Sequence, residues 1–283
     1  MISGIRFTKA QALGNDFAII DDRQGTVSLS ESEIVALCDR RRGIGADGIL
    51  LLQPSTAGAF LMRTLNSDGT EAEMCGNGIR CAAKYAYDTG LSRQTEIPIE
   101  TKAGLRTVEI VEIEDGHATT IRVDLGLPDF ERAHVPMAGP AGEVILEPLA
   151  IGETSVDITA LSIGNPHAVT FVGDAMAAAV AVLGPAIERH PAFPARTNVE
   201  FTEVISRNHL RLRVWERGAG ETDACGTGAA AAVVAAHRAG LAERRARVSL
   251  PGGDLDVEWA ESGRIFITGG AALVYTGTTG DGS

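Results

Sequence analysis

The sequence predicts a mixed α/β fold of the α+β type, built from two similar halves. When the chain is shifted by 150 residues, Cys75-Gly76-Asn77-Gly78 falls on Cys225-Gly226-Thr227-Gly228. Between residues 75 and 91, seven of 17 positions are identical at this shift, where composition alone gives about one or two. Each half also has the same order of a strand, an acidic turn, Cys-Gly-x-Gly and an Ala-rich segment. We therefore expect an internal duplication with its boundary near residue 125.

Local patterns predict the elements in chain order. Residues 31–41 are expected to form a helix with Ser30 as its N-cap. Alternating apolar and polar residues predict strands at 61–65, 107–113, 119–125, 210–215, 255–259 and 264–268. The segments 79–87 and 229–237 predict helices that end at Gly90 and Gly240, and their apolar character on nearly every side predicts that the rest of each half surrounds them. The tail, 276–283, has no apolar anchor and is expected to be loose.

Composition excludes several classes of protein. The 283 residues carry a net charge of −12, which disfavours a nucleic-acid partner. No apolar run approaches the roughly 18 residues that span a bilayer, so we expect no membrane partner. The N-terminal MISGIRFTKA lacks a signal-peptide pattern, and we expect a cytoplasmic protein. The four cysteines contain no CxxC spacing, so neither a disulfide framework nor a zinc site is expected.

Cys75 and Cys225 each fall where a strand turns into the start of a helix. Unpaired backbone N–H groups and the helix dipole favour a thiolate there, so we expect lowered thiol pKa values. Two such sites in related halves indicate a pair of acid–base groups facing each other across a cleft. That arrangement suits inversion of a carbon centre, in which one thiolate removes a proton and the other thiol returns one to the opposite face. Cys38 and Cys81 lie inside predicted helices and are expected to be structural.

The residues around these cysteines resemble the diaminopimelate epimerase family over essentially the whole chain. The matching segments are LGNDF (13–17), GIGADG (43–48), NSDGTEAEMCGNGIRC (66–81), GNPHAV (164–169), FPARTNVEF (193–201) and WERGAGETDACGTGAAA (215–231). The resemblance implies cofactor-free interconversion of LL- and meso-2,6-diaminoheptanedioate, without pyridoxal phosphate or metal, in lysine and cell-wall precursor biosynthesis. It also implies a homodimer whose subunit has two domains, each a curved mixed β-sheet around a central helix, with the cleft between them. The implied domains are 1–123 with 272–283, and 124–271.

The resemblance also implies roles for individual residues. Cys75 and Cys225 would be the two catalytic bases, and His167 and Glu216 would tune the pKa values of their thiols. Tyr275 aligns with a tyrosine linked to dimerisation. The implied substrate-binding residues are Asn15, Asn66, Gly76, Asn77, Asn165, Asn198, Glu216, Arg217, Gly226 and Thr227. Amide side chains suit a zwitterion, and an arginine suits the distal carboxylate of the substrate.

One departure and three alternatives remain at this point. Gly48 stands where some members of the family carry a Gln that contacts the substrate, so a water molecule or the backbone would replace that contact.

A related two-cysteine proline or hydroxyproline racemase would share the fold, but resembles CGHG rather than CGNG at the first cysteine. A related isomerase with a carboxylate base would lack both cysteines. A noncatalytic amino-acid-binding protein would have no need for two activated thiols.

Overall fold

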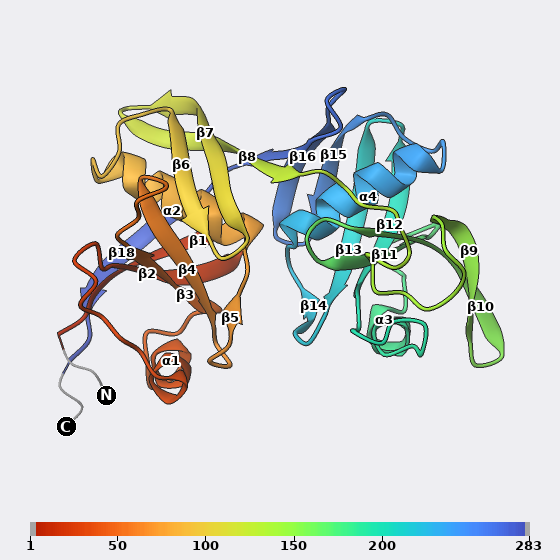
Figure 1. Ribbon diagram of the computed structural model, residues 1–283, viewed down its shortest axis with the longest axis horizontal. Coiled ribbons are helices and arrows are strands. Elements are labelled where there is room, and N and C mark those ends of the chain that lie inside the picture. Colours follow the sequence, from red (N-terminus) through yellow and green to blue (C-terminus); the bar gives the residue numbers. More distant parts are fainter. Residues whose placement is uncertain (1–3, 281–283) are drawn as a thin grey trace. The chain divides into compact units, whose positions relative to one another are not determined.

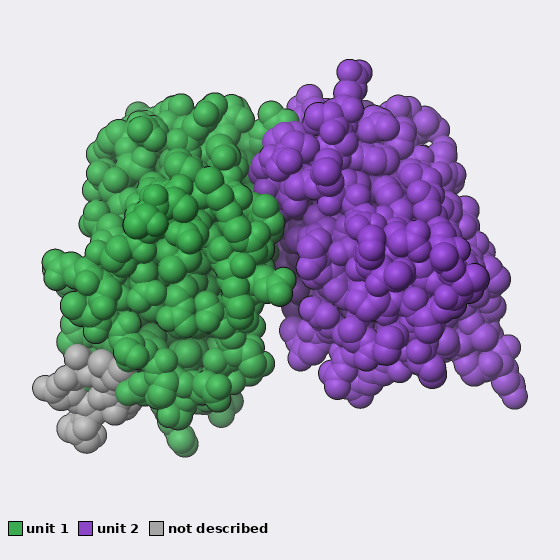
Figure 2. Space-filling view, viewed as in Figure 1, with its two compact units in different colours: residues 1–123, 269–283 green, residues 124–268 purple. Residues whose placement is uncertain are grey.

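The computed structural model describes residues 4–280 and divides the chain into two compact units (Figure 2). Unit 1 runs up to Val123 and resumes at Gly269, and unit 2 is Asp124–Thr268. The second boundary therefore lies slightly before the 271/272 division that the resemblance implies. Within the described residues, no helix is both long and apolar enough to cross a membrane.

Unit 1 is one mixed sheet with two helices (Figure 1). In order of pairing, β18 (Ala272–Thr278) is antiparallel to β1 (Arg6–Ala12), β1 to β2 (Asn15–Asp21), and β2 is parallel to β3 (Gly48–Gln53). The sheet continues through β4 (Phe60–Asn66), which pairs with the short β5 (Glu71–Ala72) and in parallel with β6 (Glu96–Thr101). The antiparallel strands β7 (Gly104–Glu114) and β8 (His117–Gly126) complete it. The helices are α1 (Glu31–Cys38) and α2 (Gly76–Asp88).

Unit 2 has the same order of pairing. Strand β9 (Val144–Ile151) is antiparallel to β10 (Thr154–Ser162), β10 to β11 (Pro166–Phe171), and β11 is parallel to β12 (Asn198–Ser206). Next comes β13 (His209–Glu216), which pairs with β14 (Gly220–Thr222) and in parallel with β15 (Arg245–Leu250). The antiparallel strands β16 (Gly253–Trp259) and β17 (Ile265–Gly269) follow. The helices are α3 (Val180–Glu188) and α4 (Gly226–Arg238).

The duplication therefore extends to strand register. Phe17 pairs with Gly48 in the parallel β2–β3 ladder, and His167 pairs with Asn198 in the β11–β12 ladder, each offset by 150 residues. One element is permuted: β9 precedes β10 in the chain, whereas its counterpart β18 reaches β1 from the C-terminal end. The sequence prediction of a duplicated α+β fold is confirmed.

The central helices are α2 and α4, as predicted. Helix α2 packs against strands of its own sheet that include β1, β2 and β7, and α4 packs against β10, β12 and β16. Ten residues of α4 are buried, from Gly226 to Ala236, because Ala, Val and Gly allow close approach of strands on every side. Each helix ends as predicted, since Gly90 and Gly240 adopt φ values of 77° and 75°, in the left-handed region that favours glycine.

The first helix begins as predicted and ends early. Ser30 forms a capping box with Glu33. The predicted end at residue 41 is wrong because α1 stops at Cys38. The Asp39 carboxylate accepts the backbone N–H groups of Arg41 and Arg42, each at 2.8 Å, and this turn competes with further helix.

The prediction of a loose tail is wrong for residues 276–279. Thr276, Gly277 and Thr278 pair with β1, and the Thr279 N–H donates to the Ile5 carbonyl at 2.9 Å. Backbone pairing holds this segment although its side chains bury little apolar surface. Residues 281–283 of the predicted tail lie outside the described residues. The acidic turns 66–74 and 216–224 also contain the short strands β5 and β14, which the sequence analysis missed.

A packing constraint on α3 allows a test of the unit 2 core. A Cβ atom at Gly184 would lie 2.6 Å from Cγ of Trp215, closer than real contacts allow. We expect Gly184→Ala to reduce the free energy of unfolding by about 1–3 kcal/mol, although Ala is otherwise favoured over Gly in a helix by about 1 kcal/mol. Urea denaturation measures this change.

Gly173→Ala is the matched control, because a Cβ atom there meets nothing within 4 Å. It should change the free energy of unfolding by less than about 0.5 kcal/mol. Equal stability of the two variants would contradict the packing of Trp215 on α3.

Candidate active site

Each central helix begins with a cysteine whose sulfur caps it. Cys75 is the N-cap of α2 and has extended backbone, with φ −132° and ψ 117°. Its Sγ accepts the Gly78 N–H at 3.4 Å. Cys225 is the N-cap of α4, with φ −130° and ψ 112°, and its Sγ accepts the Gly228 N–H at 3.4 Å. The first N–H groups of a helix have no intrahelical acceptor, so each sulfur lies where an anion is favoured.

The glycine three residues after each cysteine makes room for the sulfur. A Cβ atom at Gly78 would lie 3.4 Å from Cβ of Cys75 and 3.0 Å from Cδ2 of Leu50. At Gly228 it would lie 3.3 Å from Sγ of Cys225 and 3.0 Å from Oε1 of Glu200. The Cys-Gly-x-Gly spacing therefore follows from the capping geometry.

In unit 1, Asn15 joins the cysteine to the helix terminus. Its Oδ1 accepts from Asn77 Nδ2 at 3.3 Å, and Sγ of Cys75 lies 3.9 Å from the same oxygen. Its Nδ2 donates to Asp47 Oδ2 at 2.9 Å, which fixes the orientation of the amide. Asp47 in turn lies in an ion-pair network with Arg40. The structure thus brings together the predicted residues Asn15, Cys75 and Asn77.

In unit 2, a chain of side chains leads to Cys225. Sγ of Cys225 lies 3.5 Å from Oγ1 of Thr227, which accepts from Asn165 Nδ2 at 3.3 Å. Oδ1 of Asn165 lies 2.8 Å from Nε2 of His167. On its other side, Nδ1 of His167 lies 2.6 Å from Oε1 of Glu200. Four predicted residues are therefore linked, and the chain ends at a carboxylate that the sequence analysis missed.

The His167–Glu200 pair is completely buried. Burial raises the pKa of Glu200, against the lowering effect of His167. The corresponding positions of unit 1, at the 150-residue offset, are Phe17 and Leu50. Unit 2 thus has a buried His–Glu pair near its cysteine, and unit 1 has apolar residues at the corresponding positions.

The expectation of a lowered thiol pKa is wrong for Cys225. Burial raises its pKa well above the ordinary value, and the negative charges of Glu216 and Glu200 raise it further. The hydrogen bonds from Thr227 and the Gly228 N–H act in the opposite direction but are outweighed. Cys225 is only 6% exposed, so its surroundings favour the neutral thiol at pH 7.

The other two cysteines are buried and free, in agreement with a structural role. Burial raises the pKa of Cys38 to about 11 and that of Cys81 to about 12. Both thiols are therefore neutral near pH 7.

The remaining predicted residues lie at strand ends. In unit 2, Asn198 Oδ1 accepts the backbone N–H of Arg217 at 2.9 Å, and its Nδ2 donates to the Pro166 carbonyl at 2.9 Å. Glu216 accepts from Thr222 Oγ1 at 2.5 Å. In unit 1, Asn66 bonds within its own turn, to Thr70 Oγ1 at 2.9 Å.

The structure also shows the surroundings of Tyr275 and Gly48, two positions that the sequence analysis singled out. Tyr275, on β18, is 48% exposed and meets the ring of Phe7 edge-on, with 6.0 Å between the ring centroids. At Gly48, a Cβ atom would lie 2.7 Å from the Leu65 carbonyl oxygen. No side chain fits there without movement of the backbone, so glycine is required by packing at this position.

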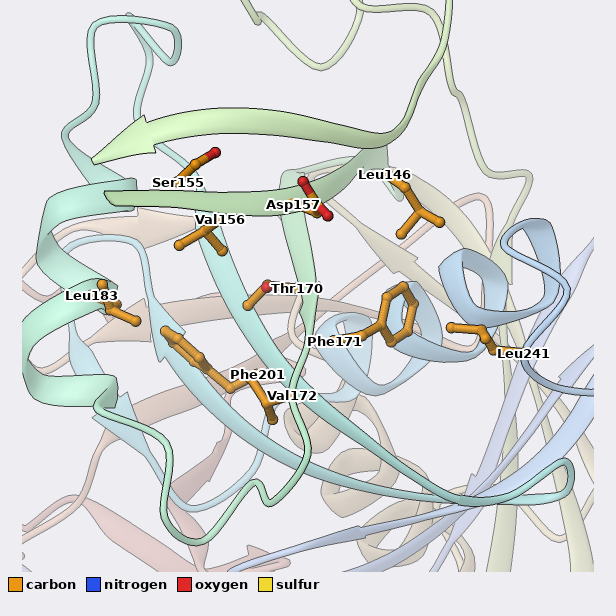
Figure 3. Close-up of a pocket in the computed structure, with 10 residues that line it drawn as sticks. All are labelled: Leu146, Ser155, Val156, Asp157, Thr170, Phe171, Val172, Leu183, Phe201 and Leu241. Carbon is orange, nitrogen blue, oxygen red and sulfur yellow. The ribbon is translucent and has the colours of Figure 1, made fainter. Parts of the chain in front are cut away.

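A pocket of about 360 Å³ in unit 2 does not contain these residues. Figure 3 shows that it lies among β9, β10, β11, β12 and α3, and its lining includes Val156, Leu183 and Phe201. Asp157 is the one ionisable residue in that lining. Among residues 4–280, no group of three or more His, Cys, Asp or Glu side chains is arranged to hold a metal ion.

Three residues of the site were missed by sequence reasoning: Asp47, Glu200 and Arg80. Arg80 Nη1 donates to the Gly76 carbonyl at 3.1 Å, and Nη2 donates to Asn77 Oδ1 at 2.8 Å. The available signal was a charged residue with an apolar neighbour on each side, as at Arg80 and Glu200.

Comparison with known proteins agrees with these features. A family model described as diaminopimelate epimerase matches residues 7–131 and 159–274. A diaminopimelate epimerase of Pelotomaculum thermopropionicum is 49% identical over 275 residues, covering 96% of this chain and 98% of the relative. Diaminopimelate epimerase 1 of a Nostoc species is 48% identical over 280 residues, covering 96% and 99%.

Solved structures show a shared fold at much lower identity. A hydroxyproline epimerase from Agrobacterium vitis, with bound trans-4-hydroxy-L-proline, has a TM-score of 0.70 and 16% identity, covering 98% of this chain and 91% of that one. A probable proline racemase from Agrobacterium radiobacter has a TM-score of 0.69 and 16% identity, covering 96% and 92%. On the match to the family model in both halves and the 49% identity over 96% of its length, this chain belongs to the diaminopimelate epimerase family.

Proposed function

We propose that this protein interconverts LL- and meso-2,6-diaminoheptanedioate, with Cys75 and Cys225 as the two acid–base groups. The observation that carries the proposal is the pair of cysteine-capped helices, each of which places a sulfur beside the backbone N–H groups of its first turn. Family membership supports the substrate. The reaction belongs to lysine and cell-wall precursor biosynthesis.

The proposed reaction is a proton exchange at one α-carbon. One sulfur, as thiolate, takes the α-proton and becomes a thiol, and the electron pair delocalises into the adjacent carboxylate. The other thiol then gives its proton to the opposite face and becomes a thiolate. The N–H groups of Gly76-Asn77 and Gly226-Thr227 would stabilise the developing charge on the carboxylate. The reverse reaction exchanges the two roles, so no external acid or base is consumed.

The distal end of the substrate carries its own carboxylate and ammonium group. We assign the carboxylate to Arg217, whose backbone is held by Asn198. Its guanidinium donates to the Ala195 carbonyl at 3.4 Å, and the fork of N–H donors suits a second, bidentate partner. Asn66 and Asn198 would complete the recognition of the zwitterion. Proline has no distal carboxylate, so an arginine in this role favours diaminoheptanedioate over a proline isomer.

A homodimer and a cytoplasmic location complete the proposal. Val274 and Tyr275 are consecutive exposed residues of β18, which supports an interface on that strand. Cys38, Cys81 and Cys225 are free thiols, which agrees with a reducing compartment.

Proton NMR of the LL isomer in D₂O, with reduced protein and no added cofactor, tests the reaction. The α-proton signal should disappear while the meso isomer accumulates. An unchanged signal here, together with exchange of proline α-protons, would favour the racemase. No exchange with either substrate would favour an amino-acid-binding protein.

Replacing either catalytic cysteine should stop the reaction. We expect Cys75→Ala and Cys225→Ala each to lower kcat by about 10²–10⁴-fold or more, because general acid–base catalysis contributes that much. Cys81→Ala is the matched control, since Ala231 occupies its position in α4. Full turnover by either active-site variant would exclude the two-base mechanism.

Loss of the Arg217 guanidinium should weaken substrate binding. We expect Arg217→Met to lower kcat/KM by about 10- to 100-fold, mainly through KM, because a charge-assisted hydrogen bond contributes about 1.5–3 kcal/mol. Arg211→Met is the control, because Arg211 lies on β13, the strand that ends just before Arg217, and pairs with Glu203 instead. Equal effects of the two substitutions would remove Arg217 from the substrate site.

The raised pKa of Cys225 predicts a pH effect of Glu216. Because the negative charge of Glu216 disfavours the thiolate, Glu216→Gln should lower the pKa of Cys225. Alkylation of Cys225 by iodoacetamide, followed by peptide mass spectrometry, should then begin at lower pH. Glu221→Gln removes an equal charge from the neighbouring Arg213 pair and should leave the profile in place. If the alkylation profile of Cys225 moved to higher pH in Glu216→Gln, this electrostatic role of Glu216 would be refuted.

A further inference from the structure

A completely buried arginine lies behind the first turn of α2. Arg80 donates to three neutral amide oxygens: the Gly76 carbonyl at 3.1 Å, Asn77 Oδ1 at 2.8 Å and the Gly270 carbonyl at 3.3 Å. Among residues 4–280, no carboxylate forms an ion pair with it. A buried charge with no opposite charge beside it is unfavourable for folding, so its presence calls for a functional reason.

The helix itself does not require this arginine. Helices α2 and α4 correspond residue by residue at an offset of 150, with the same cysteine cap and the same terminal glycine. The position of Arg80 is occupied in α4 by Ala230, which is also completely buried. A methyl group is therefore sufficient to pack a central helix of this kind at that position.

The electrostatic partners of Arg80 are thiols. Burial lowers the pKa of Arg80, whereas a thiolate at Cys81 or at Cys75 raises it. Cys81 does not supply a charge near pH 7, because burial raises its pKa to about 12. Cys75 is the remaining partner. Electrostatic coupling between two groups is reciprocal, so the Arg80 charge favours the thiolate form of Cys75 by the same interaction.

Other charged groups around α2 are largely neutralised by one another. On α2 itself, Lys84 pairs with Asp88. Strands β1, β2 and β4 contribute Lys9 paired with Asp16, Asp21 paired with Arg23, Arg63 paired with Glu71, and the exposed Arg6. Strand β7 contributes the half-buried Arg106 and the exposed glutamates 109, 112 and 114. Strand β3 carries no acidic or basic side chain, and β18 carries only the exposed Tyr275. Asp47, next to β3, pairs with Arg40.

We propose that Arg80 is a positioning residue that holds Cys75 in its thiolate form in the resting protein and orients the Asn77 amide toward Asn15. In reaching Gly76 and Asn77, the guanidinium contacts both residues that would bind the reacting carboxylate. The proposal rests on the proposed function in making Cys75 a proton acceptor. Unit 2 has the opposite electrostatics, since the carboxylates of Glu216 and Glu200 act on Cys225.

The test is the pH dependence of Cys75 alkylation, measured by peptide mass spectrometry without turnover. Arg80→Met removes the charge and keeps most of the side-chain volume. At pH 7 the rate of Cys75 alkylation by iodoacetamide should fall about ten-fold or more, and the profile should move to higher pH. Arg80→Lys should restore part of the rate. Lys84→Met, which removes one positive charge from the same helix, should leave the Cys75 profile in place.

The outcomes separate this proposal from a structural role and from the proposed function. A folded Arg80→Met protein with reduced epimerisation and an unchanged Cys75 profile would overturn it. If Arg80→Met does not fold, the alkylation profiles of Cys75 in Arg80→Lys and in the wild-type protein decide. Wild-type Cys75 that is alkylated only above about pH 8.5, as an ordinary thiol is, would also overturn the proposal. A shifted Cys75 profile in a protein that does not epimerise diaminoheptanedioate would support the role of Arg80 and contradict the proposed function instead.

Discussion

The chemistry that we propose for this protein depends on a hydrogen bond from a helix N–H to a cysteine sulfur, which is present at the start of both central helices. The bond requires extended backbone at the cysteine and glycine three residues later, at the start of a helix whose body is buried. Each requirement has a consequence in the fold. The Ala-rich helix allows strands to surround it, and the strand before each acidic turn delivers the cysteine to the helix terminus.

The two units use one scaffold to create two electrostatic environments. The two units share their strand order, their strand register and the length of their central helix. The charged residues near the two sulfurs, however, carry opposite charges. Behind Cys75 lies the buried guanidinium of Arg80, and beside Cys225 lie the buried His167–Glu200 pair and the carboxylate of Glu216. The reaction that we propose starts with one base and one acid, and such a reaction needs this kind of difference. Divergence of a few buried positions supplies it without changing the fold.

Much of the fold was predictable because its signals are local. Alternation along 210–215, the glycine ends at Gly90 and Gly240, and the Ser30 cap depend on neighbouring residues alone. The errors came where non-local pairing or a side chain competed with local preference. Pairing with β1 orders Thr276–Thr278 despite their weak apolar character. The turn at Asp39 ends α1 at Cys38, before the predicted end at residue 41.

The candidate active site was likewise predictable in part from local sequence and in part not. The repeated Cys-Gly-x-Gly determined by itself that two cysteines cap two related helices, because the spacing is a property of one helical turn. Only tertiary structure decided the environment of each sulfur. Glu200 lies 25 residues before Cys225 in the sequence, yet its charge raises the pKa of that thiol. The helix dipole, which the sequence reveals, favours a thiolate, whereas burial and nearby carboxylates, which only the folded chain creates, outweigh it at Cys225.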